Sequence, residues 1–338
     1  MNARRQRGFT LIEMMIGIVI GLFGLLAITE VLVDFNVNRN AVTQTMESQN
    51  NGTMALYLME RDLLKAGYGM MNIQDCSNIN WYFNSAVQTP LTTLPVKITD
   101  GGAASDSIEV QYANSSAGVP ATLISQAQNT YADPLSVASV VGLASGNLVI
   151  ADAGGVCTLY GVTAVNNVSG ALSHASTSAY NPASDPGNGW DPVPVSSTLV
   201  NLGSNFVDRR YGITANALAT ASFPSYASST SVDGIVFMKA QYGRDTNGDG
   251  TVDTWSAGTW VPDNSTANQI VAVRIGVVAR SLETIAGVAP SSITLLPELK
   301  DLTGVSIGAR VDYTLPDRNY RYKAYSTIIP LRNVIWSK

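Results

Sequence analysis

The stretch FTLIEMMIGIVIGLFGLLAITEVLV, residues 9–33, decides how the amino-terminal part of the chain folds. It is apolar apart from Glu13, Glu30 and a few hydroxyl side chains. At about 1.5 Å per residue, a helix of this length spans the hydrocarbon core of a bilayer. The apolar core of a cleavable secretory signal is shorter and is followed by a small-residue cleavage site, which is missing here. We therefore expect a retained membrane-spanning helix.

The charges around this helix predict its orientation. Arg4, Arg5 and Arg7 precede it, and no basic residue follows it closely. Basic residues stay on the cytoplasmic side of a membrane. The amino terminus should therefore be cytoplasmic, and the rest of the chain should be exported.

The helix is expected to continue beyond the membrane as an amphipathic segment, residues 34–70. The stretch NGTMALYLMERDLLKAGYG, residues 51–69, repeats apolar residues every three or four positions, which is typical of one buried helix face. These residues are Leu56, Met59, Leu63 and Ala66. Beside them, Arg61, Asp62 and Lys65 are expected on a solvated face with local ion pairs, and a contact with another subunit is the alternative.

Residues 71–338 show the pattern of a β-rich head. Short apolar runs alternate with turn residues, as expected for strands. We predict strands at 106–113, 147–152, 157–165, 234–242, 270–281, 308–315 and 320–331. Residues 166–197 are rich in loop formers, and a long loop excursion is expected over about 166–230. The fold class is α+β: a long amino-terminal helix with a large antiparallel sheet head.

The composition argues against several functions. Only 13% of the 338 residues are charged, and the formal net charge is −5, so binding to nucleic acid is not expected. The sole histidine, His174, is expected on the surface, and no nucleophile–base set is visible. We do not expect an enzyme.

The two cysteines, Cys76 and Cys157, belong to no metal-binding spacing. In an exported head they are expected to form one disulfide, and two buried free thiols are the alternative.

The amino terminus resembles the type IV prepilin signature, in which a basic leader and a glycine precede FTLIE and an apolar helix. The resemblance implies that a prepilin peptidase removes residues 1–8 by cutting between Gly8 and Phe9. It also implies that the new amino group of Phe9 is methylated. The segments MERDLLKAGYG (59–69) and YKAYSTIIPLRN (322–333) resemble the PilW-like minor pilins, so a pilin-like fold is expected.

Glu13 places a carboxylate in an otherwise apolar segment, which is costly in lipid. Pairing between Glu13 of one subunit and the Phe9 amine of a neighbour would offset this cost and would set the stagger of the helices. The alternative is that Glu13 reaches the membrane interface or is neutralised by a proton.

A calcium-like loop lies in the stretch RDTNGDGTVDTW, residues 244–255. Asp245, Asn247, Asp249, Thr251 and Asp253 are spaced like the ligands of a D-x-N-x-D-G calcium loop, but Ser256 stands where the last carboxylate would be. Oxygen ligands suit Ca²⁺, with weak binding of roughly 10⁻⁴ to 10⁻³ M. A plain hairpin turn without metal is the alternative.

These features together predict a minor pilin that takes part in type IV pilus assembly, in a tip or initiation complex. Its expected partners are prepilin peptidase, other minor pilins and the major pilin. It should reside in the inner membrane before assembly and on the cell surface afterwards. A minor pseudopilin of a type II secretion system and a pilus-tip adhesin or ligand-binding module are the alternatives.

Overall fold

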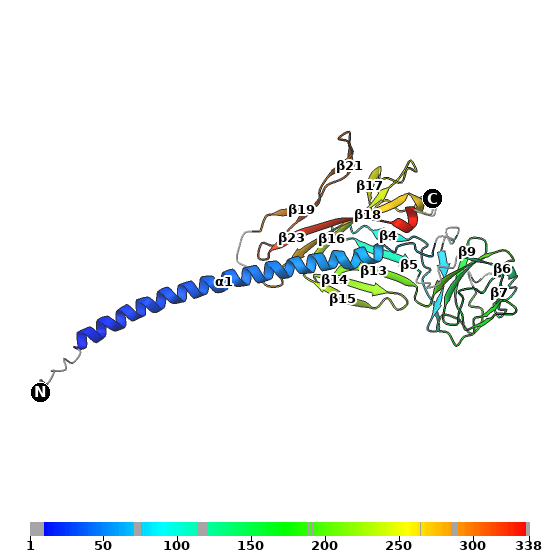
Figure 1. The fold of residues 1–338 in the computed structure, drawn as a ribbon, viewed down its shortest axis with the longest axis horizontal. Helices are drawn as coiled ribbons and strands as arrows, with labels where there is room; N and C mark the ends of the chain where they lie inside the picture. Colours follow the sequence, from blue (N-terminus) through cyan, green and yellow to red (C-terminus); the bar gives the residue numbers. More distant parts are fainter. Residues whose placement is uncertain are drawn as a thin grey trace, which may run out of the picture.

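The computed structural model describes residues 10–70, 76, 78–113, 121–187, 190, 192–263, 265–284 and 289–335. A single helix, α1 (Leu11–Leu63), projects from a head made of strands (Figure 1). The amino-terminal half of α1 stands clear of the head, and its carboxyl-terminal half lies along it. Within the described residues, α1 is the one helix long and apolar enough to cross a membrane, and its most apolar 18-residue window is fully unburied.

Three sheets form most of the head. A five-stranded sheet has the order β15-β14-β13-β5-β4, and a four-stranded sheet has the order β17-β16-β18-β23. The bounds are β4 (Val96–Thr99), β5 (Ser107–Tyr112), β13 (Val207–Thr214), β14 (Ala217–Ser222), β15 (Ser228–Asp233), β16 (Ile235–Arg244), β17 (Thr254–Ala257), β18 (Ile270–Arg280) and β23 (Tyr322–Pro330). All neighbours in these two sheets pair antiparallel.

The third sheet has eight strands in the order β1-β9-β8-β12-β6-β7-β11-β10. Its strands are β1 (Asn78–Asn80), β6 (Thr122–Gln126), β7 (Leu135–Val137), β8 (Leu148–Asp152), β9 (Val156–Gly161), β10 (Ala164–Asn166), β11 (Ala171–Ser173) and β12 (Thr198–Gly203). We call this sheet with its loops, residues 78–80 and 121–203, the distal lobe. Figure 1 places its strands β6, β7 and β9 at the end of the head opposite the amino terminus of α1.

Short elements complete the described chain. Three two-stranded ladders pair β2 with β3, β19 with β22, and β20 with β21. Their bounds are β2 (Tyr82–Phe83), β3 (Ala86–Val87), β19 (Ser292–Leu296), β20 (Leu299–Lys300), β21 (Ser306–Gly308) and β22 (Val311–Thr314); the short helices are η2 (Ala267–Gln269) and α2 (Arg332–Ile335).

The carboxyl-terminal half of α1 is built into the main core. Ala55, Met59 and Leu63 are fully buried and pack among β18 residues such as Val273 and Ile275. Their spacing of four residues puts them on one face of the helix. The helix also packs on β23 and β15. Burying this face holds the projecting helix and the head together as one body.

The fold class expected from the sequence is confirmed: a long amino-terminal helix precedes a head of mainly antiparallel sheets. Each predicted strand overlaps an observed one. The buried helix face differs slightly, because Ala55 is buried and Leu56 is only partly so.

The long loop excursion expected over about 166–230 is wrong for its second half, residues 198–230. Residues 166–197 contain only the short strand β11 among the described residues, but β12, β13 and β14 follow, and β15 begins at Ser228. Strands β14 and β15 consist mostly of Ala, Thr and Ser. Such residues carry little apolar periodicity, so their sequence looks like loop although the backbone pairs fully.

Gly52 of α1 marks the closest approach of the helix to β23. A Cβ atom at this position would overlap the ring of Tyr325, at Cδ2 and Cε2. We expect Gly52→Ala to lower the free energy of unfolding by about 1–3 kcal/mol, as overpacking does, although alanine normally stabilises a helix by about 1 kcal/mol over glycine. Thermal unfolding of the full chain in detergent measures this. Gly24→Ala is the control, because its Cβ would meet no atom within 4 Å; equal midpoints for both variants would contradict the contact.

Candidate functional site

The first site is the amino-terminal end of α1, where Glu13 lies. Thr10 caps the helix: Glu13 N donates to Thr10 Oγ1 (3.4 Å), and Thr10 N donates to Glu13 Oε2 (2.8 Å). The Thr10 hydroxyl also donates to the same oxygen, at 2.9 Å. This reciprocal capping box satisfies backbone donors that a helix start leaves unpaired. The T-x-x-E spacing of residues 10–13 is the sequence signature of this capping box.

Capping gives Glu13 a role within its own helix. The pairing between Glu13 and the Phe9 amine stays a prediction, because Gly8 and Phe9 lie outside the described residues.

The second site joins the end of α1 to the head, and its centre is Asp62. This carboxylate is 1% exposed and accepts a hydrogen bond from Arg209 Nη1 at 2.6 Å. The hydroxyl of Tyr211 donates to Asp62 at 2.6 Å, and that of Tyr112 donates at 3.2 Å. Arg209 and Tyr211 come from β13 and Tyr112 comes from β5, so Asp62 fastens the helix to two neighbouring strands.

The electrostatics of this junction favour a charged pair. Burial raises the pKa of Tyr211, and its hydrogen bond to Asp62 adds to the effect. Burial and then the Asp62 charge raise the pKa of Tyr112. For Arg209, burial lowers the pKa, but the Asp62 charge and the interactions with Tyr211 together outweigh it, so the net change is upward. Both tyrosines therefore remain donors, and Arg209 remains a cation, at neutral pH.

The expectation that Asp62 lies on a solvated face is wrong. Its spacing from Met59 and Ala66, three and four residues, already puts Asp62 on the buried face. Arg61 does lie at the surface, where its Nε is 3.5 Å from Asp62. Lys65 is exposed too, with its Nζ 5.6 Å from the centre of the Tyr112 ring.

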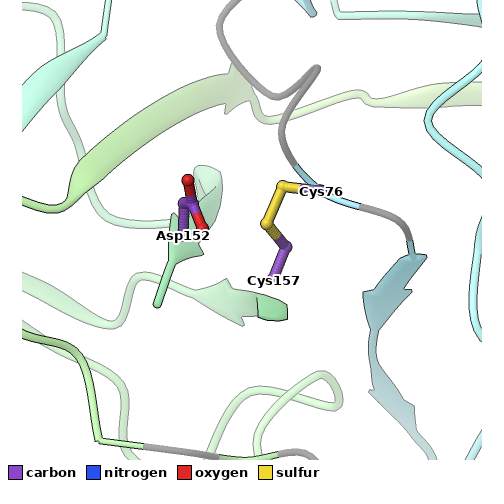
Figure 2. Close-up of side chains that lie close together, drawn as sticks. All are labelled: Cys76, Asp152 and Cys157. Atoms are coloured by element: carbon purple, nitrogen blue, oxygen red, sulfur yellow. A yellow bond between two sulfur atoms is a disulfide. The ribbon is translucent and has the colours of Figure 1, made fainter. Parts of the chain in front are cut away.

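Cys76 and Cys157 form a disulfide, with their Cα atoms 5.6 Å apart. Figure 2 shows the bond beside Asp152, and both cysteines are fully buried. Cys157 lies on β9. This strand pairs in parallel with β1, which begins two residues after Cys76. Among the described residues, these three side chains are the only group of potential metal ligands found within 4.8 Å of one another. Since both sulfurs are bonded to each other, the group is a cross-link and not a metal site.

The calcium-like loop connects β16 to β17. Asp245 is buried, and its carboxylate accepts from the amides of Gly248 (2.6 Å) and Gly250 (2.9 Å). Asp253 accepts from the Thr246 amide at 2.7 Å, and Asp249 accepts from that of Thr251 at 2.7 Å. Hydrogen bonds from Thr251 lower the pKa of Asp249.

The side-chain and backbone atoms of this loop that could bind a metal are all oxygens, and oxygen ligands suit Ca²⁺. The three carboxylates, however, are engaged with backbone amides, and they do not all lie within 4.8 Å of one another. Thr251 and Asn247 take part in the same network, and Asn247 Nδ2 donates to Asp249 at 3.2 Å. The loop is therefore closed by its own hydrogen bonds, and calcium binding stays a prediction.

His174 is not the surface residue expected from its sequence. It is buried in the distal lobe, and its Nε2 lies 2.9 Å from the carbonyl oxygen of Asp133. Its ring packs against Tyr131 and Tyr160. Burial lowers the pKa of His174, so the imidazole is neutral at pH 7. The flanking loop formers gave no sign of these aromatic neighbours.

Comparisons with known proteins bear on both ends of the chain. The family model described as Type IV Pilus-assembly protein W matches residues 208–333. The model of the prokaryotic N-terminal methylation motif matches residues 3–29. The solved type IV-like pilin from Thermus thermophilus aligns over 85% of this chain and 97% of its own, at 9% identity and a TM-score of 0.37. No curated protein matches the chain.

An apolar helix that bears the methylation motif and is built into a β-rich head defines a pilin-type subunit. The PilW model covers the part of β13 that carries Arg209 and Tyr211, and it ends at Asn333, whose side-chain amide donates to the Ala66 carbonyl just after α1. The matches over residues 3–29 and 208–333 support a PilW-like type IV minor pilin, a subunit that takes part in pilus assembly. As such it is anchored through its apolar helix and interacts with other pilins.

Proposed function

We propose that the chain acts in a tip or initiation complex of the pilus, after prepilin peptidase has cut between Gly8 and Phe9. Its partners would be other minor pilins and the major pilin, reached through α1 from the inner membrane. The observation that supports this proposal most strongly is that the apolar half of α1 is exposed along its length. In water such a surface is unfavourable, so it has to be covered by lipid or by other helices.

The size of the head supports the tip position. The distal lobe adds a complete eight-stranded sheet to the part of the head that packs on α1. A subunit with such a lobe is difficult to repeat along a thin filament, and one copy at the end avoids this. The subunit would act by assembly and not by catalysis.

Immunogold labelling of isolated pili tests this position. We expect label at one end of each filament. Regular label along the shaft would contradict a tip complex.

Glu13 allows capping to be separated from pairing between subunits. Glu13→Gln removes the charge but keeps a side-chain oxygen that can accept from Thr10, whereas Glu13→Ala removes both. We expect both variants to lower the number of surface pili strongly, because the Phe9 amine loses its partner charge in either case. Counting pili by electron microscopy measures this, with Thr10→Ala as the control for the cap. Wild-type pilus numbers with Glu13→Gln would show that Glu13 serves the cap alone.

We also propose that the loop 245–253 binds calcium weakly. With roughly 10 mM calcium and a dissociation constant of about 1 mM, binding stabilises the folded chain by about 1.4 kcal/mol. Thermal unfolding of the full chain in detergent should then show a midpoint a few degrees higher in calcium than in chelator. The increase should be lost in Asp249→Asn, whose carboxylate is exposed. Identical midpoints for the wild type in calcium and chelator would favour the plain turn.

A further inference from the structure

A cavity of about 800 Å³ opens at the far end of the distal lobe. Its walls come from the loop between β6 and β7, from the residues after β11, and from residues 182–185. Strands β6 and β7 lie at the end of the head opposite the amino terminus of α1 (Figure 1). Neither family model reaches this part of the chain, since they match residues 3–29 and 208–333. The pilin role of α1 therefore does not account for the cavity.

The cavity is within the size range of small-ligand sites, which is about 300–1,000 Å³. Its polar lining is rich in hydroxyl groups, from Thr130, Ser173, Ser176 and Ser184, with the amide of Asn129 beside them. Hydroxyl and amide groups both donate and accept hydrogen bonds. Such a lining matches a ligand that presents many hydroxyl groups of its own.

The charge of the lining narrows the class of ligand. Asp185 is the only charged residue among the described residues that line the cavity, and it is acidic. Its Oδ1 accepts from the Gly187 amide at 2.8 Å. An anionic ligand such as a phosphate, a nucleic acid or a sulfated glycan would meet no cation in this lining and would be repelled by Asp185. A neutral ligand fits.

Two rings give the cavity an apolar, rigid wall. Tyr131 and His174 both line it, with ring centres 5.1 Å apart. Tyr131 is held in place because its hydroxyl donates to the Pro182 carbonyl at 3.0 Å and its ring meets that of Trp190 edge to face at 5.5 Å. Aromatic faces carry partial negative charge, so they attract the weakly positive C–H groups of a sugar ring.

His174 adds an unsatisfied polar atom in this wall. Its Nε2 lies 2.9 Å from the Asp133 carbonyl oxygen, which can only accept, and 3.1 Å from the side-chain nitrogen of Gln128, which can only donate. Nδ1 is buried without a hydrogen-bond partner in the described part of the chain. A buried polar atom left unpaired costs about 1–3 kcal/mol.

We propose that this cavity binds a neutral oligosaccharide. The sugar ring lies against Tyr131 and His174, and its hydroxyl groups exchange hydrogen bonds with Thr130, Ser173 and Ser184. Its lining loops adjoin β6 and β7, which lie at the end of the head opposite the amino terminus of α1. The proposal goes beyond pilus assembly, and neither depends on the other.

Saturation-transfer NMR on the full chain tests the proposal, in a detergent without a sugar headgroup so that the detergent does not compete. The probes are lactose, cellobiose, maltose and chitobiose, with inorganic phosphate as the anionic control. We expect saturable binding of at least one disaccharide and none of phosphate. Absence of binding by all the disaccharides, or binding of phosphate at the same site, would overturn the proposal.

Matched variants assign the binding to the cavity. Ser176→Trp and Ala183→Trp each place a large side chain in it from an exposed position, and Ala104→Trp makes the same change on an exposed turn before β5. We expect affinity to fall by about tenfold or more, which is at least about 1.4 kcal/mol, in either cavity variant that retains the wild-type unfolding temperature, and to stay unchanged in Ala104→Trp. Undiminished binding in both cavity variants would overturn the assignment. Pilus number should stay at the wild-type level in all three, so a failure of binding is distinguishable from a failure of assembly.

Discussion

Replacing Asp62 by alanine is expected to lower the free energy of unfolding by about 3–5 kcal/mol, the range for breaking a buried ion pair from one side. Asp62 is buried, and its oxygens accept from Arg209 at 2.6 Å and Tyr211 at 2.6 Å. Without the carboxylate, the guanidinium stays largely covered, with its side chain only 26% exposed, and loses its counter-charge. Such a loss is a large share of the total stability of a typical domain.

Urea unfolding of the full chain in detergent, followed by circular dichroism, measures the loss. Glu47→Ala is the matched control, because Glu47 is an exposed acid on the same helix and changes of that kind stay within about 0.5 kcal/mol. A double variant, Asp62→Asn with Arg209→Met, removes both charges together and should lose less than Asp62→Ala. If Asp62→Ala is no more destabilising than Glu47→Ala, that result would contradict a stabilising buried contact of Asp62 with Arg209 and Tyr211.

Loss of the disulfide is the second large effect expected. The bond between Cys76 and Cys157 closes a loop over a sequence separation of 81 residues. In the chain-entropy model a loop of this length contributes about 4 kcal/mol, mainly by restricting the unfolded chain. We expect Cys76→Ser combined with Cys157→Ser to lose about 2–4 kcal/mol. The effect should concentrate in the distal lobe, because β9 and the segment before β1 are the parts that the bond connects.

Tryptophan fluorescence provides a local readout of this loss when Trp81 is kept and the other four of the five tryptophans are replaced by phenylalanine in every protein compared. Trp81 is buried in the same core cluster as both cysteines. The midpoint of its unfolding in urea should decrease in the double serine variant and, equally, in the wild type under reducing conditions. The wild type in oxidising buffer is the reference. An unchanged midpoint in the reduced protein would mean that the cross-link does not restrain the lobe.

The long helix α1 and the central strands β16 and β18 could be predicted from the sequence because their signals are local. The apolar run 9–33 and the stripe through Met59 and Leu63 define a long helix without any tertiary information. The large apolar residues of 235–244 and 270–280 likewise define strands that the structure contains as β16 and β18. These segments have patterns that only one secondary structure satisfies.

The junction and the cavity could not be predicted because they depend on long-range contacts. Arg209 is 147 residues from Asp62, and nothing in either local sequence pairs the two. His174 is surrounded in sequence by small polar residues, whereas its ring neighbour Tyr131 comes from another loop. Its burial is a property of the assembled lobe.

The central claim, that this PilW-like chain serves pilus assembly, is tested most directly by deleting its gene and counting surface pili by electron microscopy. The alternative is a minor pseudopilin of a type II secretion system, so secretion is measured in the same strain. We expect the deletion strain to have few or no pili with normal secretion, and to recover pili when the wild-type chain is restored. Normal pilus numbers together with failed secretion would contradict it.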